Sequence, residues 1–123
     1  MEINKNDIIA VVGVSSDSAK YGNKVFFNLV GKGFEVLAVH PDGGEVDGHK
    51  RYPTLSDLPK TPDLVVSVVK PEITEKIAAE CVKLGVKRLW MQPGSESQAA
   101  IELAEKNGIE VVHDDCVMVR TSQ

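Results

Sequence analysis

The stretch IIAVVGVSSDSAKYGNKVFFNLVGKGFEVLAVHP, residues 8–41, decides the fold. Its apolar run at 8–12 predicts a buried strand, and the run at 35–39 predicts a second one. Between them lie a turn rich in glycine and serine and an amphipathic stripe that predicts a helix. In such a strand–turn–helix unit, the backbone N–H groups of the turn and of the helix N-terminus form a site where a phosphate group binds.

Three further apolar runs, at 64–69, 87–91 and 110–113, also predict strands. They are nearly continuous rather than alternating, as in a parallel sheet that is covered on both faces. Helical stripes lie between them. The ends of the predicted helices are marked by Gly33, Gly85 and Gly108, the usual C-cap residue. Their starts are marked by Pro71 and by Ser95 or Ser97.

The alternation of strands and helices predicts an α/β fold over residues 1–123, a single Rossmann-like, doubly wound domain. We expect a five-stranded parallel sheet in the order 3-2-1-4-5, with helices on both faces. The ligand crevice is expected at the carboxyl ends of strands one and four. The segment 42–62 is rich in Gly, Pro and Asp. It predicts a long binding loop with one helical turn around 55–58.

The composition limits the classes of function. The 123 residues are 42% hydrophobic and 26% charged, which is ordinary for a globular protein. No apolar run is long enough for a membrane helix, and the N-terminus does not resemble a signal peptide. Two cysteines without metal-ligand spacing fit the cytoplasm. A net charge of −4 without a basic stripe argues against nucleic acid as a partner.

The glycine spacing argues against a dinucleotide ligand. A G-x-G-x-x-G fingerprint is followed by an acid about twenty residues later, which holds the ribose hydroxyls. Here only Gly13 matches, and the next glycine of the loop is Gly22. The second strand ends at His40-Pro41, and Asp42 lies beyond the proline. An NAD(P)-binding Rossmann protein or oxidoreductase is therefore the less favoured alternative.

The loop nevertheless keeps the chemistry of a phosphate site. Gly13 permits close approach of the backbone, Lys20 supplies a positive charge, and Asn23 opens the helix whose dipole favours an anion. Hydroxyl groups come from Ser15, Ser16 and Ser18. The alternative interpretation is a serine-rich turn that only caps the helix.

Four segments together resemble a known family. They are GVSSDSAKYGNKV (13–25), GFEVLAVHP (33–41), YPTLSDLP (52–59) and the run from VKRLWMQPGSES to VVHDDCVMV (86–119). They resemble the small stand-alone CoA-binding domains, which are similar to the CoA-binding domain of the succinyl-CoA synthetase alpha subunit. The family usually has Asn-Pro where this chain has His40-Pro41, a change that introduces a titratable group.

The resemblance implies that coenzyme A is the ligand and assigns its parts to three groups of residues. The diphosphate would lie over the loop, at Gly13, Val14, Ser15, Ser16, Lys20, Tyr21, Gly22 and Asn23. The adenosine end would lie near His40, Pro41, Val69, Lys70, Pro71 and Ile73. The pantetheine arm would run toward Gln92, Pro93 and Gly94.

Other reactive residues carry less weight. Cys116 could form a mixed disulfide with CoA, but Asp114 and Asp115 beside it should raise its pKa, so an inert thiol is favoured. The histidines have no metal-ligand spacing, and no metal site is predicted. The basic triplet 49–51 is expected to be a solvated loop, and Trp90 to lie in the core or at a dimer interface.

No catalytic set of residues stands out. We therefore predict a non-catalytic module that binds CoA or an acyl-CoA, as a carrier or a sensor. The chain is too short for a complete acyl-CoA ligase. A subunit that completes such a ligase in trans, and a homodimer, remain open.

Overall fold

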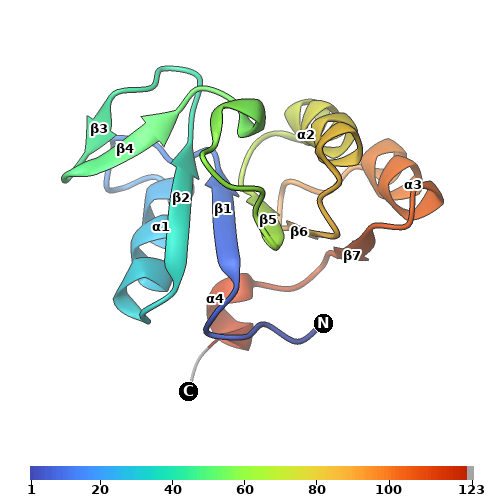
Figure 1. Ribbon diagram of the computed structural model, residues 1–123, viewed down its shortest axis with the longest axis horizontal. Helices are drawn as coiled ribbons and strands as arrows, with labels where there is room; N and C mark the ends of the chain where they lie inside the picture. The colour runs from blue at the N-terminus through green and yellow to red at the C-terminus, as the bar shows by residue number, and fades with distance from the viewer. Residues whose placement is uncertain (122–123) are drawn as a thin grey trace.

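The computed structural model describes residues 1–121, in which strands and helices alternate (Figure 1). The strands are β1 (Ile8–Val12), β2 (Glu35–Val39), β3 (Glu45–Val46), β4 (His49–Tyr52), β5 (Leu64–Ser67), β6 (Arg88–Met91) and β7 (Glu110–Val112). The helices are α1 (Tyr21–Gly31), the single turn η1 (Leu55–Asp57), α2 (Pro71–Leu84), α3 (Gln98–Lys106) and α4 (Val117–Arg120). All five predicted strands are present, with ends within two residues of the prediction.

The strands form one mixed sheet in the order β3-β4-β2-β1-β5-β6-β7. Neighbours from β4 to β7 pair in parallel, whereas β3 pairs antiparallel with β4. The prediction of five parallel strands is therefore wrong in number. The order of the predicted strands is also wrong, because β5, which was placed outside β2, pairs with β1.

The error comes from residues 42–62, which were expected to form a loop. They contain the β3–β4 hairpin, and β4 takes the third parallel position beside β2. Asp47 and Gly48 form its turn, with φ of 48° and 82°. Two consecutive positive φ values are typical of the two-residue turns that Asp-Gly favours, so this dipeptide was the missed signal. The predicted turn at 55–58 is confirmed as η1.

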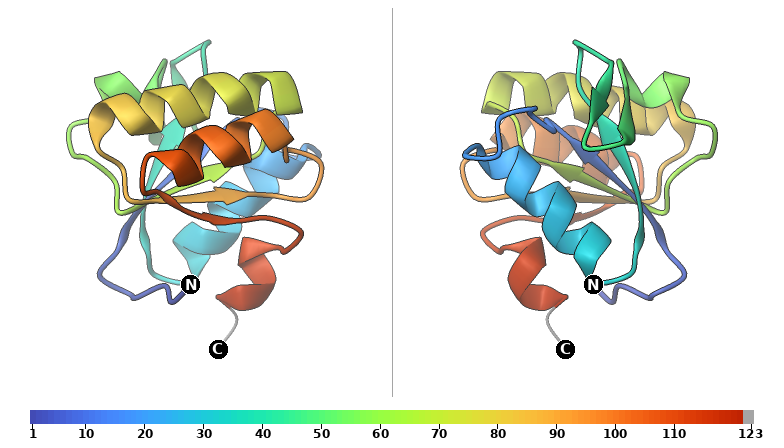
Figure 2. Two further views of the ribbon diagram at one scale, coloured as in Figure 1. Left: turned by 90° about the vertical axis from the view of Figure 1, so that its right-hand side faces the viewer. Right: turned by 90° about the vertical axis from the view of Figure 1, so that its left-hand side faces the viewer.

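Two hydrophobic clusters lie on opposite faces of the sheet, because successive side chains of a strand alternate. On β1, Ile9 and Val11 pack with residues of α1 and α4, whereas Ala10 and Val12 pack with residues of α2 and α3. Figure 2 shows the same two layers of helices with the sheet between them. Within residues 1–121, no helix has the length and apolar content that spanning a membrane requires.

The predicted helix ends are confirmed. Gly33, Gly85 and Gly108 all have positive φ, and Gly85 is the left-handed C-cap of α2. Pro71 is the first residue of α2. Of the two candidate caps for α3, Ser97 takes the role, since its hydroxyl accepts a hydrogen bond from the Ala100 N–H at 3.3 Å.

Candidate ligand-binding cleft

A cleft of about 930 Å³ lies over the carboxyl ends of β1, β2 and β5. This volume is at the upper end of the roughly 300–1,000 Å³ that small-molecule sites occupy. In the Rossmann order the strand sequence reverses between the first and fourth parallel strands, here β1 and β5. The crevice was expected between the first strand and the strand at 87–91, and the corrected order moves it to this point.

The cleft brings together ten of the predicted binding residues. Those that line it are Gly13, Tyr21, His40, Pro41, Val69, Lys70, Pro71, Ile73, Pro93 and Gly94. The predicted residues outside the lining are Val14, Ser15, Ser16, Lys20, Gly22, Asn23 and Gln92. All but the last belong to the glycine loop or to the start of α1, where they are close in sequence to the lining residues Gly13 and Tyr21.

Nine lining residues were not predicted: Val12, Val39, Pro53, Thr54, Val68, Lys76, Ile77, Glu80 and Ser95. Two signals could have found some of them. Lys76, Ile77 and Glu80 follow Ile73 at helical spacing, and therefore share its face of α2. Pro53 and Thr54 directly follow β4, and they were missed because that strand was missed.

The two glycines of the loop meet in space. A Cβ atom on Gly22 would collide with the carbonyl oxygen of Gly13. Gly13, at φ 104°, leaves no room for a Cβ either, which would lie 2.6 Å from the Val68 carbonyl oxygen. The nine-residue spacing therefore lets the start of α1 rest directly on the end of β1. Gly13 acts through this packing as well as by lining the cleft.

Helix α1 begins without a capping side chain. Its N-cap residue is Lys20, whose side chain makes no cap hydrogen bond. The first intrahelical N–H donor is Lys24, which bonds to the Lys20 carbonyl. The N–H groups of Tyr21, Gly22 and Asn23 thus precede the first helical bond, and together with the helix dipole they favour an anion.

The serines of the loop are only partly available to a ligand. The Ser15 hydroxyl accepts the Asp17 N–H at 3.0 Å, and the Asp17 carboxylate accepts the Ala19 N–H at 2.9 Å. Asn23 donates from Nδ2 to the Ser15 carbonyl at 2.9 Å. Ser16 is exposed. The loop therefore offers backbone N–H groups more than a row of hydroxyls.

The charged groups of the cleft are mainly basic. Lys70 and Lys76 line it together with His40, and the acid among them is Glu80. Glu80 accepts hydrogen bonds from the N–H and the hydroxyl of Ser56, at 3.2 and 3.0 Å. His40 Nδ1 accepts the Asp42 N–H at 3.1 Å, which leaves Nε2 as the ring nitrogen free to meet a ligand.

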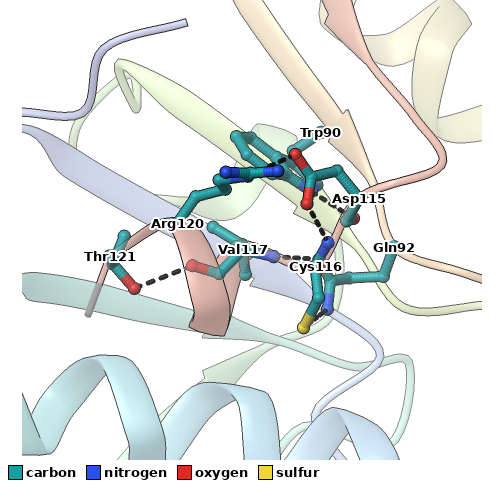
Figure 3. Close-up of polar contacts among 7 residues, drawn as sticks. All are labelled: Trp90, Gln92, Asp115, Cys116, Val117, Arg120 and Thr121. Atoms are coloured by element: carbon teal, nitrogen blue, oxygen red, sulfur yellow. Dashed lines mark hydrogen bonds and ion pairs between the residues drawn. The ribbon is translucent and has the colours of Figure 1, made fainter.

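Cys116 lies in a network that joins three parts of the chain, two of which, the end of β6 and the start of α4, are drawn in Figure 3. Its Sγ lies 3.4 Å from the Tyr21 hydroxyl and 3.4 Å from Gln92 Nε2. Gln92 is fully buried, donates to the Tyr21 hydroxyl at 2.7 Å, and accepts the Val117 N–H at 2.7 Å. Gln92, which is a predicted ligand contact, thus forms a buried link between the start of α1 and the start of α4.

The prediction of a raised Cys116 pKa is wrong. Burial raises the pKa of this thiol, but hydrogen bonds from Tyr21, Gln92 and the N–H groups of Met118 and Val119 together lower it below the ordinary value. The Asp115 carboxylate is turned to other partners, the Arg120 guanidinium at 2.6 Å and the Cys116 N–H at 2.9 Å. Burial raises the pKa of Tyr21 to about 12, so its hydroxyl stays protonated.

Two further expectations are settled by burial. Trp90 is 2% exposed and lies in the core, where its indole N–H donates to the Asp115 carbonyl at 2.9 Å. The expectation of a solvated basic loop at 49–51 is wrong, because these residues belong to β4 and Arg51 is buried. Among residues 1–121, no group of three or more His, Cys, Asp or Glu side chains is placed to hold a metal ion.

Comparison with known proteins identifies related sequences and folds. A family described as a CoA binding domain matches residues 7–122. The chain is similar to a solved conserved hypothetical protein from Pyrococcus furiosus, with 44% identity and a TM-score of 0.88. That match covers 93% of this chain and 98% of the other.

Longer relatives carry ligase names. An ADP-forming acetate–CoA ligase II subunit alpha of Pyrococcus furiosus is 31% identical over 89% of this chain. An ADP-forming acetate–CoA ligase I of Archaeoglobus fulgidus is 28% identical over 93% of it. The chain spans 26% of the first and 18% of the second.

Proposed function

Because the chain belongs to the CoA-binding domain family, we propose that it binds coenzyme A or an acyl-CoA in the cleft, as a non-catalytic carrier or sensor. The observation that carries the proposal is the cleft of about 930 Å³ at the β1–β5 switch point. Its lining includes Gly13 of the glycine loop and Tyr21 at the uncapped start of α1. An elongated ligand with phosphate groups suits both features.

In this proposal the diphosphate lies over the glycine loop at the start of α1. The adenosine end lies between His40-Pro41 and the first turn of α2, where Pro71 and Ile73 line the cleft. The pantetheine arm runs toward Pro93 and Gly94, which also line the cleft. The ammonium groups of Lys70 and Lys76 suit the charge of the additional ribose phosphate that distinguishes CoA from NAD, and His40 offers Nε2 as a hydrogen-bonding group.

Isothermal titration with CoA, NAD⁺ and FAD tests the ligand. We expect CoA to bind most tightly, and tighter binding of either dinucleotide would overturn the proposal. Lys20→Ala should weaken CoA binding about fivefold, as loss of roughly 1 kcal/mol from an exposed charge pair implies. Lys106→Ala is the matched control, because Lys106 is an exposed lysine in the last turn of α3.

The ligase relatives favour a second candidate, a subunit that completes an acyl-CoA ligase whose other domains lie on a separate chain. It rests on the small share of those relatives that this chain spans. Purification of the native protein tests it. A stoichiometric partner with nucleotide-binding domains, and ADP-forming acyl-CoA synthesis by the pair, would favour this role over that of a carrier.

A further inference from the structure

Arg51 is a buried cation beside the glycine loop. It lies on β4 and is 8% exposed. Its Nε donates to the Gly43 carbonyl at 2.6 Å, and its Nη1 donates to the Val14 carbonyl at 3.0 Å. A single guanidinium thereby ties the segment after β2 to the residue that follows Gly13.

The charge of Arg51 has no acidic partner within residues 1–121, where it forms no ion pair and its bonds go to neutral carbonyls. A guanidinium does not lose its proton in a protein, and a buried charge is costly unless it is paired. Its Nη2 has no hydrogen bond in that part of the chain and is not fully enclosed. The charge is therefore not completely shielded from solvent.

Two consecutive peptide groups of the loop are fixed by side chains. Arg51 holds the Val14 carbonyl, and Asn23 holds the next one, that of Ser15. In a trans peptide the C=O and the following N–H point in opposite directions. The N–H groups of Ser15 and Ser16 are therefore turned away from Arg51 and Asn23, and neither has a backbone acceptor within residues 1–121.

Successive free N–H groups backed by a positive charge form an anion site. We infer that Arg51 is the positioning residue of the phosphate loop, and that the diphosphate of the bound nucleotide supplies the counter-charge that Arg51 lacks among the described residues. This inference rests on the proposed CoA-binding function. It predicts that Arg51 favours ligands that carry a diphosphate. Arg51 does not line the cleft, so it acts on the ligand through the loop that it positions.

The test compares Arg51→Met with Lys50→Met and Arg51→Lys. Lys50 is the adjacent, exposed residue of β4, so its substitution removes the same charge from the same strand. CoA and dephospho-CoA, which share the diphosphate, should both bind Arg51→Met about tenfold more weakly, with a smaller dependence on salt. Lys50→Met should behave like the wild type. Arg51→Lys should retain the salt dependence, because lysine keeps the charge but cannot hold both carbonyls.

Inorganic pyrophosphate provides a readout that does not require CoA. It should raise the melting temperature of the wild type and of Lys50→Met, and leave that of Arg51→Met unchanged. If Arg51→Met does not fold, Arg51→Gln serves instead, because it also removes the charge, and pyrophosphate should leave its melting temperature unchanged. A purely structural role for Arg51 would leave the salt dependence and the pyrophosphate shift of the folded variant without the charge at wild-type values, and would overturn the inference. Failure of the wild type to bind CoA would contradict the proposed function, while the pyrophosphate shift still tests Arg51.

Discussion

Two helices begin at the same edge of the sheet and differ in how they begin. Helix α3 follows β6, and its N-cap Ser97 accepts the Ala100 N–H and donates to the Glu75 carboxylate at 2.8 Å. Helix α1 follows β1, and its N-cap Lys20 makes no cap hydrogen bond. The start of α3 is thus closed by the protein's own side chains, whereas the start of α1 is open.

The uncapped helices α1 and α2 contribute their first turns to the lining of the cleft. The first residue of α1 lines it, as do Pro71 and Ile73 in the first turn of α2, which also begins without a capping hydrogen bond. The residues of α3 itself do not line it. A helix start that lacks a cap leaves N–H donors for another acceptor, and an anionic ligand can take that role.

The largest effect is expected where α1 rests on β1. Gly22→Ala places a methyl group against the carbonyl oxygen of Gly13, a backbone atom that cannot move aside alone. We expect a loss of about 3 kcal/mol in the free energy of unfolding, measured by urea denaturation, together with loss of CoA binding.

Gly31→Ala is the control for that change. Gly31 is in the same helix, and a Cβ there meets nothing within 4 Å. Because alanine favours helix by up to about 1 kcal/mol over glycine, this variant should be more stable than the wild type. Equal stability losses at both positions would contradict the role of the Gly13–Gly22 contact.

Closing the open helix start should separate stability from binding. Lys20→Asp supplies the carboxylate cap that α1 lacks, so the unfolding free energy should rise by roughly 1 kcal/mol. The same carboxylate removes a positive charge and repels a diphosphate, so CoA should bind about thirtyfold more weakly, or roughly 2 kcal/mol. If Lys20→Asp raised both the unfolding free energy and the affinity for CoA, the uncapped start of α1 would not be the site that binds the ligand.

Opening the closed helix start should have the converse result. Ser97→Ala removes the cap of α3 and the partner of Glu75, which should lower the unfolding free energy by about 1 kcal/mol. CoA affinity should stay within twofold of the wild type, because Ser97 does not line the cleft. Ser97→Thr keeps a hydroxyl acceptor and should restore most of the stability.

The smallest effect concerns α4, whose start carries Cys116. Because the fold lowers the pKa of this thiol, its alkylation by iodoacetamide should reach half-maximal rate below the pH of a free cysteine. Tyr21→Phe removes one donor to the sulfur, so it should slow alkylation about threefold at pH 8. Cys81 is an internal control that should not be alkylated, since burial raises its pKa to about 12.

The same shift predicts how stability depends on pH. A thiol with a lowered folded pKa stabilises the fold at pH values above its unfolded pKa, and this contribution is lost as the pH falls through the folded pKa. Cys116→Ala should remove this stabilisation at alkaline pH, which urea denaturation at several pH values measures. An unchanged pH profile of unfolding in Cys116→Ala would contradict the lowered pKa.

Much of the fold could be predicted because the signals were local. The five apolar runs, the C-cap glycines and the Pro71 start depend on residues that are close in sequence, and all are present. The short β3–β4 hairpin has no apolar run, and its Asp47-Gly48 turn was read as part of a loop. Missing β4 displaced β5 in the predicted order and hid the lining residues Pro53 and Thr54.

The candidate site was predictable only where the sequence carries a pattern. The loop from Gly13 to Gly22 and the His40-Pro41 strand end could be recognised because spacing alone distinguishes them from a dinucleotide site. The surroundings of Cys116 could not, because Tyr21 and Gln92 are 95 and 24 residues away in the chain. Its sequence neighbours suggested a raised pKa, but Asp115 turns to Arg120.

The sequence by itself determined that the chain alternates strands and helices, where most of them end, and that a glycine loop without a ribose-binding acid follows the first strand. Each is a property of a few adjacent residues, whose backbone preferences and periodicity act locally. Only the tertiary structure decided which strands are neighbours, that Arg51 donates a hydrogen bond to the glycine loop, and that the thiol of Cys116 contacts Tyr21. These depend on contacts between distant segments, and burial and hydrogen bonding then set the charge and availability of each group.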